Sequence, residues 1–226
     1  MQKKNIGGFP FISFERDCYD GEMMKLRCSS FYKQMNERRT CRDFLDKPIP
    51  KEIIDNLILT ASTAPSGAHK QPWTFCVVSN PQIKKQICIE AEKEEYESYH
   101  GRMPEEWKKD LLPLQTDWKK EFLEVAPYLI IVFKKSYDFD AAGNKTNTYY
   151  ANESCGIACG FLLAAIHNAG LVALTHTPSP MNFLSTVLNR PANEKPFLLI
   201  PVGYAAEECW VPDIKRKELN EVAVFY

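Results

Sequence analysis

The 226-residue sequence predicts an α+β protein in which helices flank a mixed sheet. Short apolar runs, typical of buried strands, alternate with longer segments whose apolar residues recur at helical spacing. No repeat, low-complexity tract or long Gly/Ser linker interrupts this alternation, which indicates a single domain over residues 1–226. Apolar residues make up 45% of the chain, an ordinary fraction for a globular protein with a core.

The expected elements follow in chain order. After an irregular start, residues 21–39 have apolar positions close to helical periodicity, and a second helix opens at Pro50. Further helices are expected over 81–100, 149–170 and 178–189, the longest of them apolar all round and stopped by Gly170. The strands are expected at 74–79, 126–133, 171–176 and 195–205. The chain ends in an alternating apolar run, "VAVFY", which needs a covering surface.

Charge and cysteine usage exclude several classes of protein. The 28 basic and 29 acidic residues give a net charge of −1, so no overall field attracts nucleic acid or an anionic membrane. No apolar run approaches the roughly 18 to 20 residues that span a bilayer, and no secretory signal is present, so we expect a cytoplasmic protein. The eight cysteines are scattered, without C-x-x-C, which indicates reduced thiols and no metal site.

Arginines gather at the end of the first long helix. Arg38, Arg39 and Arg42 lie within five positions, and Arg216 lies in a second basic stretch, "KRK", near the C-terminus. Arginines at the junction of a helix and a loop can grip a phosphate with paired hydrogen bonds. The alternative is a solvated helix end, which is common for clusters of this size.

The loop "TAPSGAH" is the second candidate. Pro65, Ser66 and Gly67 allow an irregular backbone whose amides can point at a ligand, although such a sequence is also an ordinary turn. The chain has neither a phosphate-binding loop motif nor a dinucleotide-binding glycine motif, which argues against a Rossmann site.

The third candidate lies between the helix at 81–100 and the strand at 126–133. Glu95 and Tyr99 are four residues apart and share one helix face, and Lys120 follows beyond a polar, aromatic and proline-broken segment that resembles a lid. An acid, a phenol and an ammonium group can converge there. The same charged pattern also fits a solvated helix face.

Several of these stretches together resemble a known family. "RRTCRDF", "TASTAPSGAHKQPW", "APYLIIVF", "PVGY" and "VPDIKRK" resemble the nitroreductase superfamily and, within it, the iodotyrosine deiodinase family. The similarity runs from about residue 38 to the C-terminus. It includes the insert of about 92–123, which generic nitroreductases lack. One departure is "TC" at 40–41, where a serine followed by an aliphatic residue is expected, and the hydroxyl is kept.

The resemblance implies a nitroreductase-like fold with a mostly antiparallel sheet, in a domain-swapped homodimer with FMN at the subunit interface. An arm of about 205–226 would embrace the partner. The residues that would bind the cofactor are Arg38, Arg39, Thr40, Arg42, Pro65, Ser66, Gly67, Thr175, His176, Thr177 and Arg216.

The resemblance also implies the substrate and the reaction. Glu95 would receive the ammonium group of a halotyrosine, Tyr99 and Lys120 its carboxylate, and the amide of Ala68 its phenolate oxygen. Thr177 would hydrogen-bond the flavin in the catalytic step, a reductive dehalogenation to tyrosine and halide by stepwise electron transfer. The electrons would come from a reductase or NAD(P)H. The first alternative is a general NAD(P)H-dependent nitro- or quinone reductase; a flavin sensor without turnover and a flavin-cleaving enzyme are others.

Overall fold

The structure, a computed structural model, describes residues 2–226 and divides the chain into two compact units, residues 1–37 and 38–226. The first unit holds a hairpin of β1 (Lys3–Ile6) and β2 (Phe9–Ile12), followed by α1 (Gly21–Glu37). The expectation of an irregular start was therefore wrong for residues 3–12. Gly7 and Gly8 both have positive φ, which is the geometry of a two-residue hairpin turn.

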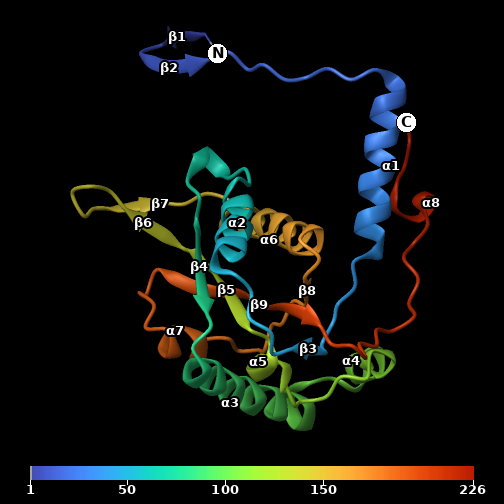
Figure 1. Cartoon of the computed structure of the whole chain (residues 1–226). Coiled ribbons are helices and arrows are strands. Elements are labelled where there is room, and N and C mark those ends of the chain that lie inside the picture. Colours follow the sequence, from blue (N-terminus) through green and yellow to red (C-terminus); the bar gives the residue numbers. More distant parts are fainter. Residues whose placement is uncertain (1) are drawn as a thin grey trace. The chain divides into compact units, whose positions relative to one another are not determined.

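The second unit is built on a sheet in the order β3-β9-β5-β4, with β8 also pairing with β9 (Figure 1). Every ladder is antiparallel, and an isolated parallel bridge joins Thr40 to Ala173, which confirms the mostly antiparallel mixed sheet. The strands are β3 (Phe44–Leu45), β4 (Trp73–Val78), β5 (Tyr128–Lys135), β8 (Val172–Ala173) and β9 (Glu194–Ala205), with a separate hairpin of β6 (Tyr137–Phe139) and β7 (Lys145–Asn147).

The helices of this unit match most of the expected ones. They are α2 (Lys51–Ser62), α3 (Pro81–Glu97), α4 (Glu105–Leu111), α5 (Phe122–Val125), α6 (Ala151–Asn168), α7 (Phe183–Val187) and α8 (Leu219–Val222), with single turns at Gly67–His69, Ser98–Arg102 and Leu112–Leu114. The helix expected over 178–189 is shorter because Pro178 and Pro180 lack N–H donors and restrict the residues before them. The strand expected over 171–176 is regular only at Val172–Ala173.

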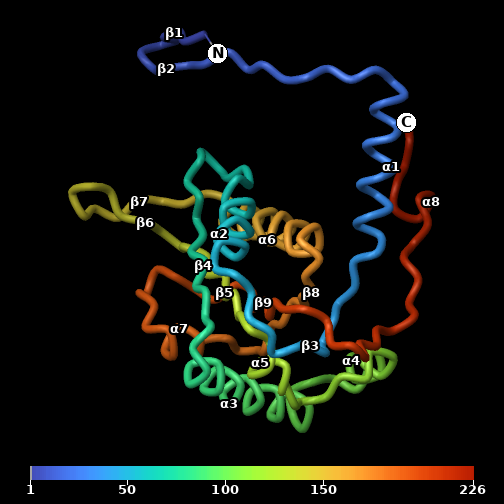
Figure 2. Tube along the Cα trace, viewed as in Figure 1, coloured from blue at the N-terminus to red at the C-terminus, as the bar shows by residue number. Residues whose placement is uncertain are grey.

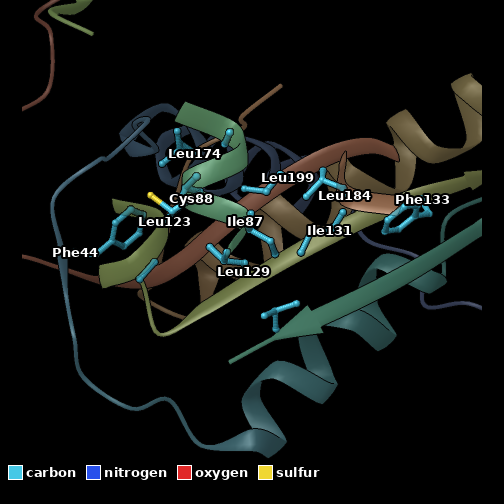
Figure 3. Packing of buried hydrophobic residues seen from close by; sticks show 13 residues of the cluster. Phe44, Ile87, Cys88, Leu123, Leu129, Ile131, Phe133, Leu174, Leu184 and Leu199 are labelled. Carbon is cyan, nitrogen blue, oxygen red and sulfur yellow. The ribbon is translucent and has the colours of Figure 1, made fainter. Parts of the chain in front are cut away.

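Strand β5 explains why its sequence is apolar at successive positions. Leu129, Ile131 and Phe133 pack against α3, α5 and α7 on one face, in the cluster drawn in Figure 3. Ile130 and Val132 lie on the other face, in the cluster formed with α2 and α6. Because successive side chains of a strand point to opposite faces, a strand covered on both sides loses the usual alternation with polar residues.

Helix α6 is covered on one side only. Its buried residues pack on α2 and the sheet, and Leu162 and Ile166 are completely buried. Ile157 and Phe161 remain 42% and 40% exposed, and the neighbouring Gly156 and Gly160 are exposed as well. The single chain therefore leaves an apolar face of its central helix open. Among residues 2–226, none of the helices combines the length and the apolar character needed to cross a membrane.

Candidate active site

The sheet fixes the arginine-rich segment in place. Thr40 bridges to Ala173 of β8, and the amide of Cys41 donates to the carbonyl of Ala173 at 3.3 Å. The C-terminal arm is held along the same segment, because the amide of Ala206 donates to the carbonyl of Asp43 at 3.0 Å. Residues far apart in the sequence therefore meet beside the end of β9.

These contacts create a cavity of about 290 Å³ lined by cationic side chains, namely Arg38, Arg39, Arg42, Lys215 and Arg216, together with Thr40. Nη2 of Arg216 donates to the carbonyl of Arg38 at 2.9 Å, which ties the arm to the cluster. Burial lowers the pKa of Arg38, and the charges of Arg216 and Arg39 lower it further. Crowding of like charges is relieved by a bound anion, so the cavity fits a phosphate group with its charge-assisted hydrogen bonds.

The lid residues form a second cavity of about 150 Å³. Glu95 comes from the last turn of α3 and Tyr99 from the π-helical turn that follows it, Ser98–Arg102. Nζ of Lys120 lies 3.6 Å from Oε2 of Glu95 and donates to the carbonyl of Asp117. It also lies 5.6 Å from the ring centre of Tyr99, so the predicted acid, phenol and ammonium converge.

Burial controls the charges of this second cavity. The side chains of Lys120 and Glu95 are 4% and 14% exposed. Burial raises the pKa of Glu95 and lowers that of Lys120, while the attraction between the two groups opposes both shifts. Burial also raises the pKa of Tyr99, whose hydroxyl donates to the carbonyl of Thr116 at 3.2 Å. The ion pair is therefore largely buried, and each member depends on a charged or hydrogen-bonding partner for its stability.

The segment after β8 has two different faces. Thr175 and Thr177 are exposed, whereas His176 between them is buried, as expected for an extended chain with alternating directions. The amide of His176 donates to the carbonyl of Leu199 at 2.8 Å, and the amide of Leu199 donates back at 3.1 Å. His176 therefore has no free backbone donor for a cofactor. Its imidazole instead lies edge-on to Phe122, with 5.8 Å between ring centres.

Arg42 lines both cavities, so the cationic cavity and the lid cavity adjoin. The sequence did not indicate this sharing. Nor did it identify other lid-cavity residues, because their composition is that of any partly apolar loop; they are Ser98, Met103, Trp107, Leu111, Thr116 and Ser179.

The loop after α2 lies elsewhere in the unit. Pro65, Ser66, Gly67 and Ala68 line neither cavity, and Figure 2 shows their loop at the opposite end of β4 from α3. The backbone is irregular as expected, with φ of 48° at Ala68. A Cβ on Gly67 would lie 2.8 Å from the carbonyl oxygen of Tyr149, so only glycine fits there. Within one chain, the predicted cofactor residues are therefore divided among three places. The arginines and Thr40 line the cationic cavity, Thr175, His176 and Thr177 line the adjoining lid cavity, and Pro65, Ser66 and Gly67 lie in the loop after α2.

The second unit is thus an α+β fold with an antiparallel sheet and two adjoining cavities, one of them lined by arginines. A sequence model of the nitroreductase family matches residues 35–204, and the chain belongs to that family.

Two sequence relatives and one crystal structure show which members of the family the chain resembles. The iodotyrosine deiodinase of Haliscomenobacter hydrossis is 60% identical over 216 residues, which cover 96% of this chain and 97% of the relative. Human iodotyrosine deiodinase 1 is 47% identical over 214 residues, covering 94% of this chain and 74% of the relative. A crystal structure of oxidized iodotyrosine deiodinase bound to FMN and 3-iodo-L-tyrosine superposes with a TM-score of 0.73 at 30% identity, covering 87% of this chain and 98% of the other.

Proposed function

We propose that this chain is an FMN-dependent oxidoreductase that dehalogenates halotyrosines, iodotyrosine as well as bromo- and chlorotyrosine, to tyrosine and halide. The observation that carries the proposal is the convergence of Glu95, Tyr99 and Lys120 in a cavity that shares Arg42 with a cationic pocket. The relatives at 60% and 47% identity that carry the name iodotyrosine deiodinase support it, as does the fold they share.

The cationic cavity would hold the phosphate of FMN. Arg38, Arg39, Thr40, Arg42 and Arg216 bring guanidinium groups and a hydroxyl to one place, and a dianionic phosphate needs several such donors. Thr175 and Thr177, exposed on one face beyond β8, would lie toward the flavin. Of the two, Thr177 would donate a hydrogen bond to the flavin ring. Bound FMN, once reduced, supplies the electrons of the reaction.

The lid cavity would hold the amino-acid end of the substrate. Glu95 carries the negative charge that an ammonium group requires, while Lys120 and Tyr99 offer an N–H and an O–H to a carboxylate. The ring would then extend toward the flavin, with its phenolate oxygen accepting from the amide of Ala68. The reaction takes up two electrons and one proton: the carbon–halogen bond breaks, a carbon–hydrogen bond forms, and the halide leaves with its electron pair.

The site would be completed by a second copy of the chain. Pro65–Ala68 lie apart from the arginines within one chain, so in the proposed dimer the partner would supply one of the two sets. The open face of α6 at Ile157 and Phe161 offers an apolar interface. The C-terminal arm, about 205–226, ends in the exposed residues Val224, Phe225 and Tyr226 and would cover the partner. The electron donor would be a reductase or NAD(P)H.

A titration of the FMN-loaded protein tests the function. Flavin fluorescence should be quenched by 3-iodo-L-tyrosine at much lower concentration than by L-tyrosine, because the halogen lowers the pKa of the phenol and favours the phenolate. After reduction with dithionite and addition of 3-iodo-L-tyrosine, one equivalent each of iodide and tyrosine should form while the flavin is reoxidised. Equal quenching by both ligands, or a flavin that stays reduced, would contradict the proposal. Sedimentation should show a dimer.

A further inference from the structure

His176 is buried beside the lid cavity and has an unused hydrogen-bonding atom. The residue is 7% exposed, and Nε2 of its imidazole has no hydrogen-bond partner. Its backbone groups are both taken by Leu199, so only the side chain is available for an interaction. An unpaired polar atom in the interior is costly, and few are left in folded proteins without a reason.

The groups that face this imidazole identify its partner. Phe122 of α5 packs edge-on against the ring and offers no polar atom. The charged groups that act on His176 are Lys120 and Arg42, and together with burial they lower its pKa to about 3. The imidazole is therefore neutral, with one nitrogen that donates and one that accepts. Because Lys120 and Arg42 are both cations, the favoured tautomer is the one whose unprotonated, accepting nitrogen faces them.

Lys120 needs such an acceptor when a substrate binds. In the structure its ammonium group interacts with the carbonyl of Asp117 and, at 3.6 Å, with Glu95. A bound zwitterion would draw Glu95 to its own ammonium group and offer its carboxylate to Lys120 instead. Together with the carbonyl of Asp117, this occupies two of the three N–H groups of Lys120. The lysine side chain is 4% exposed, so its third N–H group is largely shielded from bulk water and needs an acceptor from the protein. His176 lines the same cavity, and its Nε2 can accept a hydrogen bond from this N–H group of Lys120.

We propose that His176 is a positioning residue for Lys120: its Nε2 accepts a hydrogen bond from the Lys120 ammonium group in the substrate-bound state and holds that group toward the ligand carboxylate. The inference rests on the proposed function, because it requires a zwitterionic ligand in the lid cavity. The role differs from that of Thr175 and Thr177, which line the same cavity but are exposed and would lie against the cofactor.

Two ligands and three variants test this role in the FMN-loaded protein. The ligands are 3-iodo-L-tyrosine and 3-iodotyramine, which lacks only the carboxylate. His176→Phe keeps an aromatic ring against Phe122 and removes the acceptor, His176→Gln restores a side-chain acceptor, and Lys120→Met removes the donor. Affinities are measured by calorimetry and flavin quenching, and flavin content by absorbance.

We expect His176→Phe to weaken binding of 3-iodo-L-tyrosine about tenfold, to leave 3-iodotyramine and flavin content unchanged, and to have no further effect in the Lys120→Met background. His176→Gln should recover most of the loss. Unchanged affinity in His176→Phe, equal weakening of both ligands, or an effect that adds to that of Lys120→Met would overturn the inference while leaving the proposed function standing. A wild-type protein that does not prefer 3-iodo-L-tyrosine to tyrosine would overturn both.

Discussion

Replacing Glu95 with glutamine tests the recognition of the ligand's ammonium group. Glu95 and Lys120 lie 3.6 Å apart with little exposure, and two unit charges at that distance attract by roughly 5 kcal/mol at an effective dielectric constant of about 20. Desolvation offsets most of this attraction. A charge-assisted hydrogen bond to the ligand should contribute about 1.5 to 3 kcal/mol net, so Glu95→Gln should weaken binding about ten- to a hundredfold.

The assay compares 3-iodo-L-tyrosine with 3-(3-iodo-4-hydroxyphenyl)propionate, which lacks only the amino group. Wild type and Glu95→Gln should differ for the first ligand and agree for the second, with flavin content unchanged. Glu97→Gln is the matched control, since Glu97 is exposed on the same helix and lines neither cavity. Equal weakening of both ligands, or loss of flavin, would refute the assignment of Glu95 to the ammonium group.

The same pair of proteins should differ in pH dependence. Burial raises the pKa of Glu95 above its usual value of 4.5, with Lys120 countering part of the shift. The ammonium group is recognised by the ionised carboxylate, so wild-type affinity should fall as the pH drops through this raised pKa. The loss should begin at a higher pH than for an exposed glutamate, and Glu95→Gln should show no such dependence. An identical pH profile in both proteins would contradict the electrostatic argument.

Three further outcomes follow from the structure. Arg38→Gln should weaken binding of FMN about ten- to a hundredfold and leave the affinity for riboflavin, which has no phosphate, unchanged. The control Arg27→Gln, on exposed α1, should change neither affinity. An equal loss of affinity for both flavins would argue against a phosphate contact. Burial and the neighbouring Cys209 raise the pKa of Cys41 to about 11, so at pH 8 it should react with iodoacetamide far more slowly than the exposed Cys18 and Cys28, as followed by mass spectrometry; equal rates would show that it is accessible. Gly203→Ala should lower the free energy of unfolding by about 1 to 3 kcal/mol, because its Cβ would lie 2.8 Å from both Phe44 and Pro127, whereas Gly101→Ala meets no atom within 4 Å and should be nearly neutral in urea denaturation.

Most of the fold was predictable because its elements carry strong local patterns. The apolar run ending at Phe133 predicted a buried strand, which the structure confirms, and the two core clusters show that it is covered on both faces. The N-terminal hairpin was not predicted, because its strands KKNI and FPFI do not alternate apolar and polar residues; the pair Gly7–Gly8 is the turn signal that could have identified it. Helix α7 is shorter than its periodicity predicts, because two prolines, Pro178 and Pro180, precede its first residue.

The candidate site was predictable in composition and not in arrangement. Residue types allowed a phosphate-binding arginine cluster and a convergence of acid, phenol and ammonium, each beside a solvated alternative, and the resemblance to a known family implied the phosphate and the amino acid as ligands. The joining of the two through Arg42 depends on the bridge between Thr40 and Ala173 and on the arm that returns to Arg38. Such contacts join residues that are far apart in the sequence, so a pattern within a short stretch of sequence does not predict them.

The sequence alone determined the alternation of helices and strands, the apolar central helix and the chemical types of the site, because these follow from periodicity and side-chain chemistry along a short stretch of chain. The tertiary structure decided that His176 is buried between the exposed Thr175 and Thr177 and lines the same cavity as Lys120, and that Pro65–Ala68 lie apart from the arginines. Both depend on which strand edges pair and which faces are covered. Strand pairing and the burial of each face depend on the free energy of packing the whole unit, and each residue contributes only a small part of that free energy.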